Sequence, residues 1–319
     1  MRRAKIGLAL SGGGMRGLAH IGVLSVLEEE GIPVDFIAGT SMGGIIALLY
    51  AAGVPLKRLR EAGEEVHLLQ IATPDPHRYG LIGHAKMAAY LAELLGRDDL
   101  TFEELRMPAA VVATDVETGE MIVLDEGPII PAMMATSAFP LMFAPVRHRG
   151  RWLVDGGAIN NFPFDLVRAM GADRVLGVAT PPSVKLSLEE SAAPRGRLGR
   201  ITLLRLFTHP GDWYRPFVIA ETTVGHTIAI VSRQRMELIP PDLLLTVSLP
   251  NVGTFATHLN RRIIAAGEQI AREHLAELRA LRDRPLPPPW RRRWADFRRR
   301  LRRAIAAYRA PLYGLHPER

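Results

Sequence analysis

Short apolar runs alternate with segments of helical periodicity along most of the chain. The first run covers residues 6–10, and after a cluster of glycines Leu18, Ile21 and Leu24 recur with helical spacing until a stop at Gly31. Further apolar runs cover residues 36–38, 109–113, 121–124, 152–154, 175–178 and 243–247. This alternation predicts an α/β fold around a central, mostly parallel sheet.

The segments between these strands divide into helices and loops. Residues 44–52 indicate a buried helix, residues 56–107 a more variable helical region with a loop at 73–76, and residues 254–281 one long helix. Residues 181–200 are rich in Pro, Ser and Gly, which predicts a loop beside the functional site.

Composition indicates one catalytic domain followed by a tail. The chain has 319 residues, 48% of them hydrophobic and 23% charged, which is ordinary for a globular protein. It contains no stretch of 18 uninterrupted apolar residues, and its N-terminal apolar run is too short for a signal peptide. The absence of cysteine excludes disulfides, thiolate metal sites and a cysteine nucleophile. We therefore expect a cytoplasmic protein with a domain at 1–284, a proline-rich linker at 285–289 and a tail at 290–319.

The net charge of +7 lies almost entirely in this tail. Residues 285–319 hold ten arginines and two acidic residues, which leaves 30 basic and 31 acidic residues in the rest of the chain. Aromatic and aliphatic residues recur every three or four positions from Trp294 to Tyr308, between arginines, as in an amphipathic helix. This pattern favours a peripheral membrane contact at the inner face of the membrane. The alternatives are a helix packed on the domain and a basic arm for nucleic acid, and we expect no nucleic acid partner.

A Gly-x-Ser-x-Gly motif carries the first candidate chemistry. Ser41 stands between Gly39 and Gly43, after an apolar strand and before an apolar helix. A sharp turn at this point would present the hydroxyl at the helix N-terminus, where the two glycines avoid clashes. The alternative is a Gly-Ser turn that only starts the helix.

A glycine-rich loop, Gly12-Gly13-Gly14 followed by Arg16 and Gly17, also connects a strand to a helix. With Asp35 it satisfies a dinucleotide-binding fingerprint, but that interpretation leaves the serine motif unexplained. An oxyanion hole, in which backbone amides of the loop bind the developing negative charge, uses both motifs and is preferred. Arg16 either holds a substrate phosphate or braces the loop, and bracing is the commoner role.

The third element is Asp155-Gly156-Gly157 at the end of an apolar strand. A carboxylate at this point, beside glycines that permit close approach, is well placed to accept a proton. By itself, an Asp-Gly pair is most often only a turn.

Together the three motifs, in this chain order, resemble the patatin-like phospholipases. Connecting segments at 113–115, 118–119, 135–140 and 161–163 extend the resemblance to about residues 4–180. The resemblance implies a three-layer α/β/α fold, to which the sequence adds the C-terminal amphipathic helical tail. It also implies a Ser-Asp dyad with Ser41 as nucleophile and Asp155 as base, an oxyanion loop at Gly12, Gly13 and Gly14, and supporting roles for the other motif residues, which are Arg16, Gly17, Gly39, Gly43, Gly156 and Gly157.

An aspartate has an ordinary pKa near 3.9 and is a poor base, so the dyad requires that burial raise it. A histidine-based triad is the competing arrangement, with His20, His84 and His148 nearest to the motifs. We expect His20 to pack structurally and His148 to face solvent.

The expected activity is hydrolysis of lipid carboxylic esters of the phospholipase A or lysophospholipase type. A regulatory scaffold without turnover and an acyltransferase are the alternatives. Residues that could line an acyl channel, or else fill the core, are Met42, Met133, Met134, Phe139, Leu141, Met142 and Phe143. Acidic residues and histidines lack ligand spacing, so we predict no metal ion, including calcium, and no cofactor.

Overall fold

A computed structural model of the chain describes residues 3–75, 77, 79–181, 210–250, 252–254 and 256–286. The tail at 290–319 and nearly all of the predicted loop at 181–200 therefore lie outside the described residues. The strands are β1 (Ile6–Leu10), β2 (Phe36–Thr40), β3 (Thr73–Pro74), β4 (Ile82–Gly83), β5 (Ala109–Asp115), β6 (Met121–Leu124), β7 (Val146–His148), β8 (Arg151–Asp155), β9 (Arg174–Ala179) and β10 (Leu243–Thr246).

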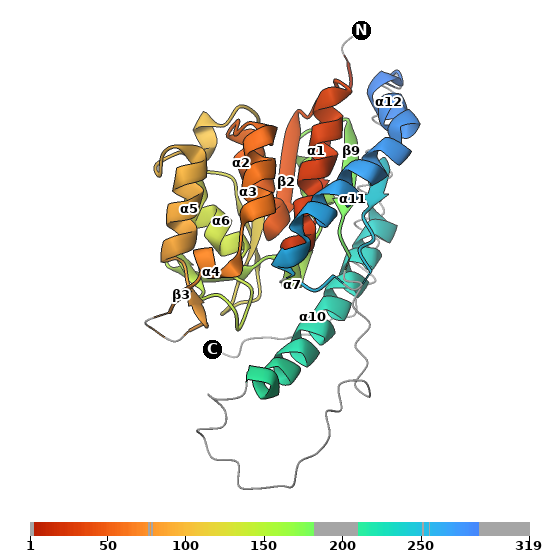
Figure 1. The fold of residues 1–319 in the computed structure, drawn as a ribbon. Helices are drawn as coiled ribbons and strands as arrows, with labels where there is room; N and C mark the ends of the chain where they lie inside the picture. The colour runs from red at the N-terminus through yellow and green to blue at the C-terminus, as the bar shows by residue number, and fades with distance from the viewer. Residues whose placement is uncertain are drawn as a thin grey trace, which may run out of the picture.

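Helices follow most of the strands (Figure 1). The α-helices are α1 (Ala19–Glu29), α2 (Met42–Ala51), α3 (Leu56–Glu65), α4 (Leu68–Ile71), α5 (Ala85–Leu95), α6 (Ile129–Thr136), α7 (Gly157–Asn160), α8 (Phe164–Ala169), α10 (Pro210–Leu238), α11 (Asn260–Glu273) and α12 (Leu275–Asp283). Short 3-10 helices are η1 (Gly14–Leu18), η2 (Phe102–Glu104) and η3 (Thr257–Leu259).

The main sheet has the order β10-β9-β1-β2-β5-β8-β7, and β6 also pairs with β5. The five strands from β10 to β5 are parallel, whereas β6, β7 and β8 join antiparallel. Each long parallel strand is buried along its length, as expected when helices cover both faces. The predicted mostly parallel sheet is confirmed.

Alternate residues of the strands enter two separate cores. Leu8 and Leu10 of β1 pack with α1, α2 and α11 in the larger core, whereas Ala9 faces a smaller core that contains Phe164 and Val167 of α8. These two cores lie on opposite faces of one sheet. The fold is therefore the predicted three-layer α/β/α sandwich.

The C-terminal helix α11 packs across the first helix, α1 (Figure 1). The crossing is close because each helix has a glycine at the contact: a Cβ on Gly22 would overlap the Ile264 carbonyl oxygen, and a Cβ on Gly267 would overlap the Ala19 carbonyl oxygen. Two segments about 240 residues apart in the chain thus form one layer.

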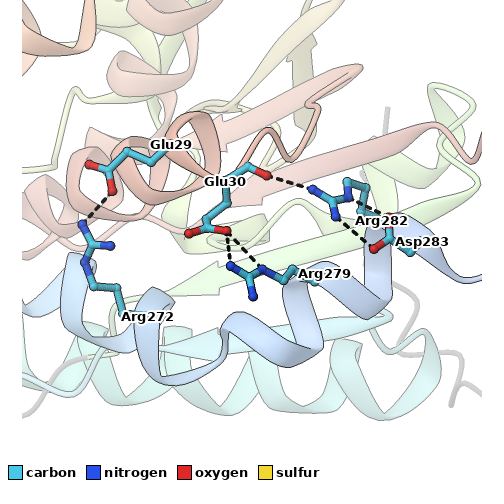
Figure 2. A network of polar contacts seen from close by, with 6 residues as sticks. All are labelled: Glu29, Glu30, Arg272, Arg279, Arg282 and Asp283. Atoms are coloured by element: carbon cyan, nitrogen blue, oxygen red, sulfur yellow. Dashed lines mark hydrogen bonds and ion pairs between the residues drawn. The ribbon is translucent and has the colours of Figure 1, made fainter.

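Charged side chains along this contact pair across the two segments (Figure 2). The Arg272 guanidinium donates to the Glu29 carboxylate at 2.7 Å, and that of Arg279 donates to the Glu30 carboxylate at 2.7 Å. Arg282 donates to the Glu30 carbonyl oxygen at 2.8 Å. Such partly exposed pairs each contribute about 0–1 kcal/mol, so burial of Ile263 and the glycine contact dominate the stability of this layer.

Three local predictions need correction. The expected single helix at 254–281 is divided into η3, α11 and α12, because His274 leaves helical geometry with φ −103° and ψ 26°. The expected loop at 73–76 contains β3, which pairs with β4 as a small hairpin. Strand β7, three residues long, was not predicted. Among the described helices, none combines the length and the apolar character needed to cross a membrane.

Candidate active site

Ser41 forms the single-residue connection between β2 and α2. Its backbone has φ 56° and ψ −130°, a conformation that non-glycine residues rarely adopt and that costs on the order of 1–3 kcal/mol. The flanking glycines are required by space: a Cβ on Gly39 would overlap the Gly43 backbone, and a Cβ on Gly43 would lie 2.5 Å from the Ser11 carbonyl oxygen. The turn is therefore sharp, and it presents the serine at a helix N-terminus.

A threonine hydroxyl braces this turn. The Thr136 hydroxyl, at the end of α6, donates to the Val112 carbonyl oxygen at 2.5 Å and accepts the Ser41 backbone N–H at 3.0 Å. Thr136 is fully buried. The sequence placed it only in a connecting segment, and the one available signal was a hydroxyl side chain at the last position of an apolar helix.

Strand β5 sets Asp155 beside Ser41. Val112 pairs with Thr40, which precedes the serine, and the next residue, Ala113, pairs with Asp155. Strand β6 pairs with residues 111–114 of β5, which overlap the partners of both β2 and β8. Because β6 fills one edge of β5 at these positions, β2 and β8 lie end to end along the other edge. Consecutive residues of one strand therefore align the two strand ends that carry the serine and the aspartate.

The Asp155 carboxyl is buried, with 5% of the residue exposed. Burial raises the pKa of Asp155 to about 6, while hydrogen bonds from the Ser41 side chain and from the Gly157 backbone N–H, the latter at 2.7 Å, oppose the rise. The carboxylate is thus mostly ionised at neutral pH but much more basic than a free aspartate.

The glycine loop packs tightly against the same site. The Gly12 N–H donates to the Asn161 carbonyl oxygen at 2.9 Å, and a Cβ on Gly12 would lie 3.1 Å from the Ser41 Cβ. Gly14 has φ 57°, which favours glycine. Within the described part of the chain, the N–H groups of Gly13 and Gly14 have no hydrogen-bond acceptor. The loop therefore presents two backbone donors, because the Gly12 donor is already used.

The remaining motif residues support these elements. The Arg16 guanidinium donates to the Val252 carbonyl oxygen at 3.0 Å, so Arg16 braces the loop at 252–254. A Cβ on Gly17 would lie 2.7 Å from the Met42 side chain, and one on Gly156 would overlap the Val112 carbonyl oxygen. Close packing, and not turn conformation, requires glycine at both positions.

The three histidines named as alternatives lie elsewhere. His20 is fully buried with Nε2 2.8 Å from the Ser11 carbonyl oxygen, and burial lowers the pKa of His20 to about 4. His84 lies with Nε2 2.6 Å from the Ala144 carbonyl oxygen. His148, in β7, has intermediate exposure and so faces solvent in part. Among the described histidines only His226, on α10, lines the pocket that contains Ser41. It was not predicted, because nothing in the sequence brings α10 to the site.

One cavity of about 170 Å³ contains Ser41, Asp155 and the glycine loop. Of the seven residues suggested for an acyl channel, Met42, Phe139 and Phe143 line it, whereas Met133 is in the core and Leu141 is 61% exposed. Met134 and Met142 pack against the core. Further apolar lining that the sequence did not reveal comes from Ile45, Ile71, Met87 and Ile228. The cavity is therefore mostly apolar.

Comparison with known families gives a match over this whole arrangement. Residues 8–168, which include Ser41, Asp155 and the glycine loop, match the family described as Patatin-like phospholipase. The chain belongs to this family. The match agrees with the resemblance stated from the motifs, and membership supports lipid hydrolase activity.

Relatives within the family share about half of this chain. An uncharacterised NTE family protein of Mycobacterium tuberculosis is 32% identical over 181 residues, covering 55% of this chain and 49% of the relative. Human patatin-like phospholipase domain-containing protein 6 is 34% identical over 183 residues, covering 54% of this chain and 13% of the relative. The chain thus spans about half the length of the mycobacterial relative and far less of the human one.

Two solved structures are similar at low sequence identity. VipD from Legionella pneumophila aligns over 87% of this chain and 67% of its own, with a TM-score of 0.49 and 15% identity. The type III effector ExoU aligns over 87% of this chain and 53% of its own, with a TM-score of 0.46 and 14% identity.

Proposed function

We propose that the protein hydrolyses carboxylic esters of lipids, in the manner of a phospholipase A or lysophospholipase, through an acyl-enzyme on Ser41. One observation carries this proposal: Ser41 and the buried carboxyl of Asp155, whose pKa a hydrogen bond from the Ser41 side chain lowers, line one mostly apolar cavity. A mostly apolar cavity suits an acyl chain, and the dyad in its wall suits the ester group.

The dyad acts in two steps. In the first, the Ser41 hydroxyl oxygen attacks the ester carbonyl carbon while its proton passes to the Asp155 carboxylate, and this proton then leaves with the alcohol product. In the second, Asp155 takes a proton from water as the water oxygen attacks the acyl-enzyme, which releases the fatty acid and restores the serine hydroxyl. The raised pKa of Asp155 favours both proton transfers.

The oxyanion formed in each step needs donors at fixed positions. We assign this role to the backbone amides of Gly13 and Gly14, which have no acceptor among the described residues and lie at the cavity wall. Gly12, whose amide donates to Asn161, contributes close packing against Ser41 instead of a donor.

Turnover of an ester tests the proposal. We expect the full chain to release fatty acid from a lysophospholipid, and Ser41→Ala to abolish the release. The regulatory scaffold is favoured if the folded chain turns over neither lysophospholipid nor a short-chain ester. The acyltransferase is favoured if an added alcohol acceptor takes most of the acyl group in place of water.

We further propose that residues 1–284 form the catalytic domain, 285–289 a linker and 290–319 a basic tail that attaches the protein to the inner face of the cytoplasmic membrane. Packing of α11 and α12 on α1 supports a domain that extends to residue 284. Liposome flotation with and without residues 290–319 tests the tail. Equal binding to anionic liposomes by both forms would show that the tail does not attach the protein to the membrane.

A further inference from the structure

Three large apolar side chains project from two adjacent loops. Tyr79, Leu81 and Leu141 expose 62%, 68% and 61% of their surface, respectively. The Leu81 N–H donates to the Leu141 carbonyl oxygen at 3.2 Å, and the next pair, Ile82 and Met142, is joined in the same way at 2.8 Å. The three side chains, here called the apolar rim, therefore belong to one hydrogen-bonded unit.

The loops that carry the rim are held in place by their own contacts. The Asp75 carboxylate accepts the Tyr79 N–H at 2.6 Å and the Gly80 N–H at 3.2 Å. A Cβ on Gly80 would lie 2.5 Å from the Ala144 backbone nitrogen, so the first loop rests directly on the second. Leu141 has φ 70°, an unfavourable conformation for a leucine that gains little from burial. A strained, exposed leucine on a braced loop indicates a function outside folding.

The rim adjoins the cavity that holds the dyad. Phe139 and Phe143, on either side of Leu141, line that cavity, as does Ile71, which precedes the Tyr79 loop. The segments that carry the rim thus also contribute to the cavity wall. Helix α10, which also lines the cavity, has exposed apolar residues of its own, which are Ile219, Val224 and Ile230.

An aromatic and cationic group flanks the rim. The Tyr79 ring lies 5.6 Å from the Trp152 ring, and the Arg147 guanidinium lies 5.7 Å from the centre of that indole. Arg147 is exposed and makes no ion pair with any carboxylate in the described part of the chain. Tyrosine, tryptophan and arginine beside exposed leucine are typical of protein surfaces at the lipid headgroup boundary.

We propose that the apolar rim inserts into the surface of a lipid bilayer, with Trp152 and Arg147 at headgroup level, and so seats the mouth of the catalytic cavity on the membrane. This inference rests on the proposed function, since only a lipid substrate needs such seating. A protein partner fits less well, because a stable protein interface takes roughly 20–30 residues on each side, whereas a few apolar side chains suffice for a lipid surface.

The test uses the full chain carrying Leu81→Asn and Leu141→Asn together. Asparagine tolerates the backbone conformation of Leu141, and neither residue lines the cavity. Leu238→Asn is the matched control, because Leu238 is 60% exposed at the far end of α10. Binding is measured by flotation with zwitterionic phosphatidylcholine vesicles in about 0.5 M salt, where screening weakens any attraction of the arginine-rich tail.

We expect the double variant to lose vesicle binding and vesicle phospholipid turnover at least about tenfold. Turnover of a soluble short-chain ester by the double variant should stay within about twofold of the wild-type rate. The Leu238→Asn control should match wild type in vesicle binding, in vesicle phospholipid turnover and in short-chain ester turnover. Three results would contradict membrane insertion by the rim: unchanged vesicle binding by the double variant, an equal loss of binding in the control, or no vesicle binding by wild type. Unchanged binding by the double variant would leave the rim as a contact for a protein. A failure of the proposed function gives a different result. In that case wild type turns over neither the vesicle phospholipid nor the short-chain ester, while vesicle binding still depends on the rim.

Discussion

The Thr136 hydroxyl accepts the Ser41 backbone N–H at 3.0 Å and fixes the strained turn from the side of α6. We expect Thr136→Val, which keeps the shape and removes the hydroxyl, to lower the free energy of unfolding by about 1–3 kcal/mol, because a polar backbone group at the turn loses its partner. Ester turnover should fall about 10-fold or more, since the serine is no longer held in position. Thr136→Ser should recover most of the turnover; a Thr136→Val variant with the wild-type kcat would show that the brace does not position Ser41.

The raised pKa of Asp155 predicts the acid side of the pH profile. Below about pH 6 the carboxyl is protonated and cannot take the serine proton, so kcat/KM for a soluble ester should fall about tenfold for each further pH unit. The measurement is kcat/KM between about pH 4.5 and 8. A profile that stays flat down to about pH 5 would contradict a buried carboxylate base.

The same shift has a consequence for stability. Between pH 3.8 and about 6 the unfolded chain has already lost the Asp155 proton that the folded chain keeps, so this group lowers stability as the pH rises. At neutral pH the buried carboxylate therefore costs up to about 3 kcal/mol. At about pH 7.5 we expect Asp155→Asn to raise the free energy of unfolding by about 1–3 kcal/mol, measured by urea denaturation. Near pH 4 this gain in stability should disappear.

Asp35 offers a control of opposite sign for this experiment. Burial acts to raise its pKa, but hydrogen bonds from Arg3 and from the Ile6 N–H outweigh burial and lower it. Its ionised form therefore stabilises the fold above the ordinary aspartate pKa, and Asp35→Asn should destabilise the protein at about pH 7.5. If both substitutions changed the free energy of unfolding at about pH 7.5 by the same amount and in the same direction, burial of the Asp155 carboxylate would not be the cause of the change.

The contact between α1 and α11 predicts that the C-terminal helices are required for folding. A Cβ on Gly267 would overlap the Ala19 backbone, so Gly267→Ala should force the helices apart and lower the free energy of unfolding by about 3 kcal/mol or more. Ala265→Ser, on the exposed side of the same helix, should change it by less than about 1 kcal/mol. Thermal unfolding of both variants measures the difference, and equal melting temperatures would show that this layer is not part of the folding unit.

The parallel strands and the positions of the motifs could be predicted because their signals are local. Apolar runs at 6–10, 109–113 and 175–178 mark buried strands, and the glycines around Ser41 mark a turn that only glycine permits. What the sequence did not reveal depends on distant contacts. The division of the helix at His274 and the brace from Thr136 to Ser41 are set by tertiary packing.

The cavity wall shows the same limit. Phe139 and Phe143 were suggested for it by their proximity to a motif, but Ile71, Met87 and His226 come from helices whose positions no local pattern specifies. Leu141 was suggested for the channel and instead lies exposed on the rim, with a left-handed backbone conformation that no local pattern predicts.

Covalent labelling with a fluorophosphonate tests the central claim most directly, because the reagent reacts much faster with a serine that is activated for attack than with an ordinary hydroxyl. We predict that the folded chain is labelled once, that peptide mass spectrometry places the label on Ser41, and that Asp155→Asn slows labelling about 100-fold or more. Ser41→Ala should abolish it. Labelling of another residue, or no labelling of protein that unfolds cooperatively, would contradict a Ser41–Asp155 hydrolase.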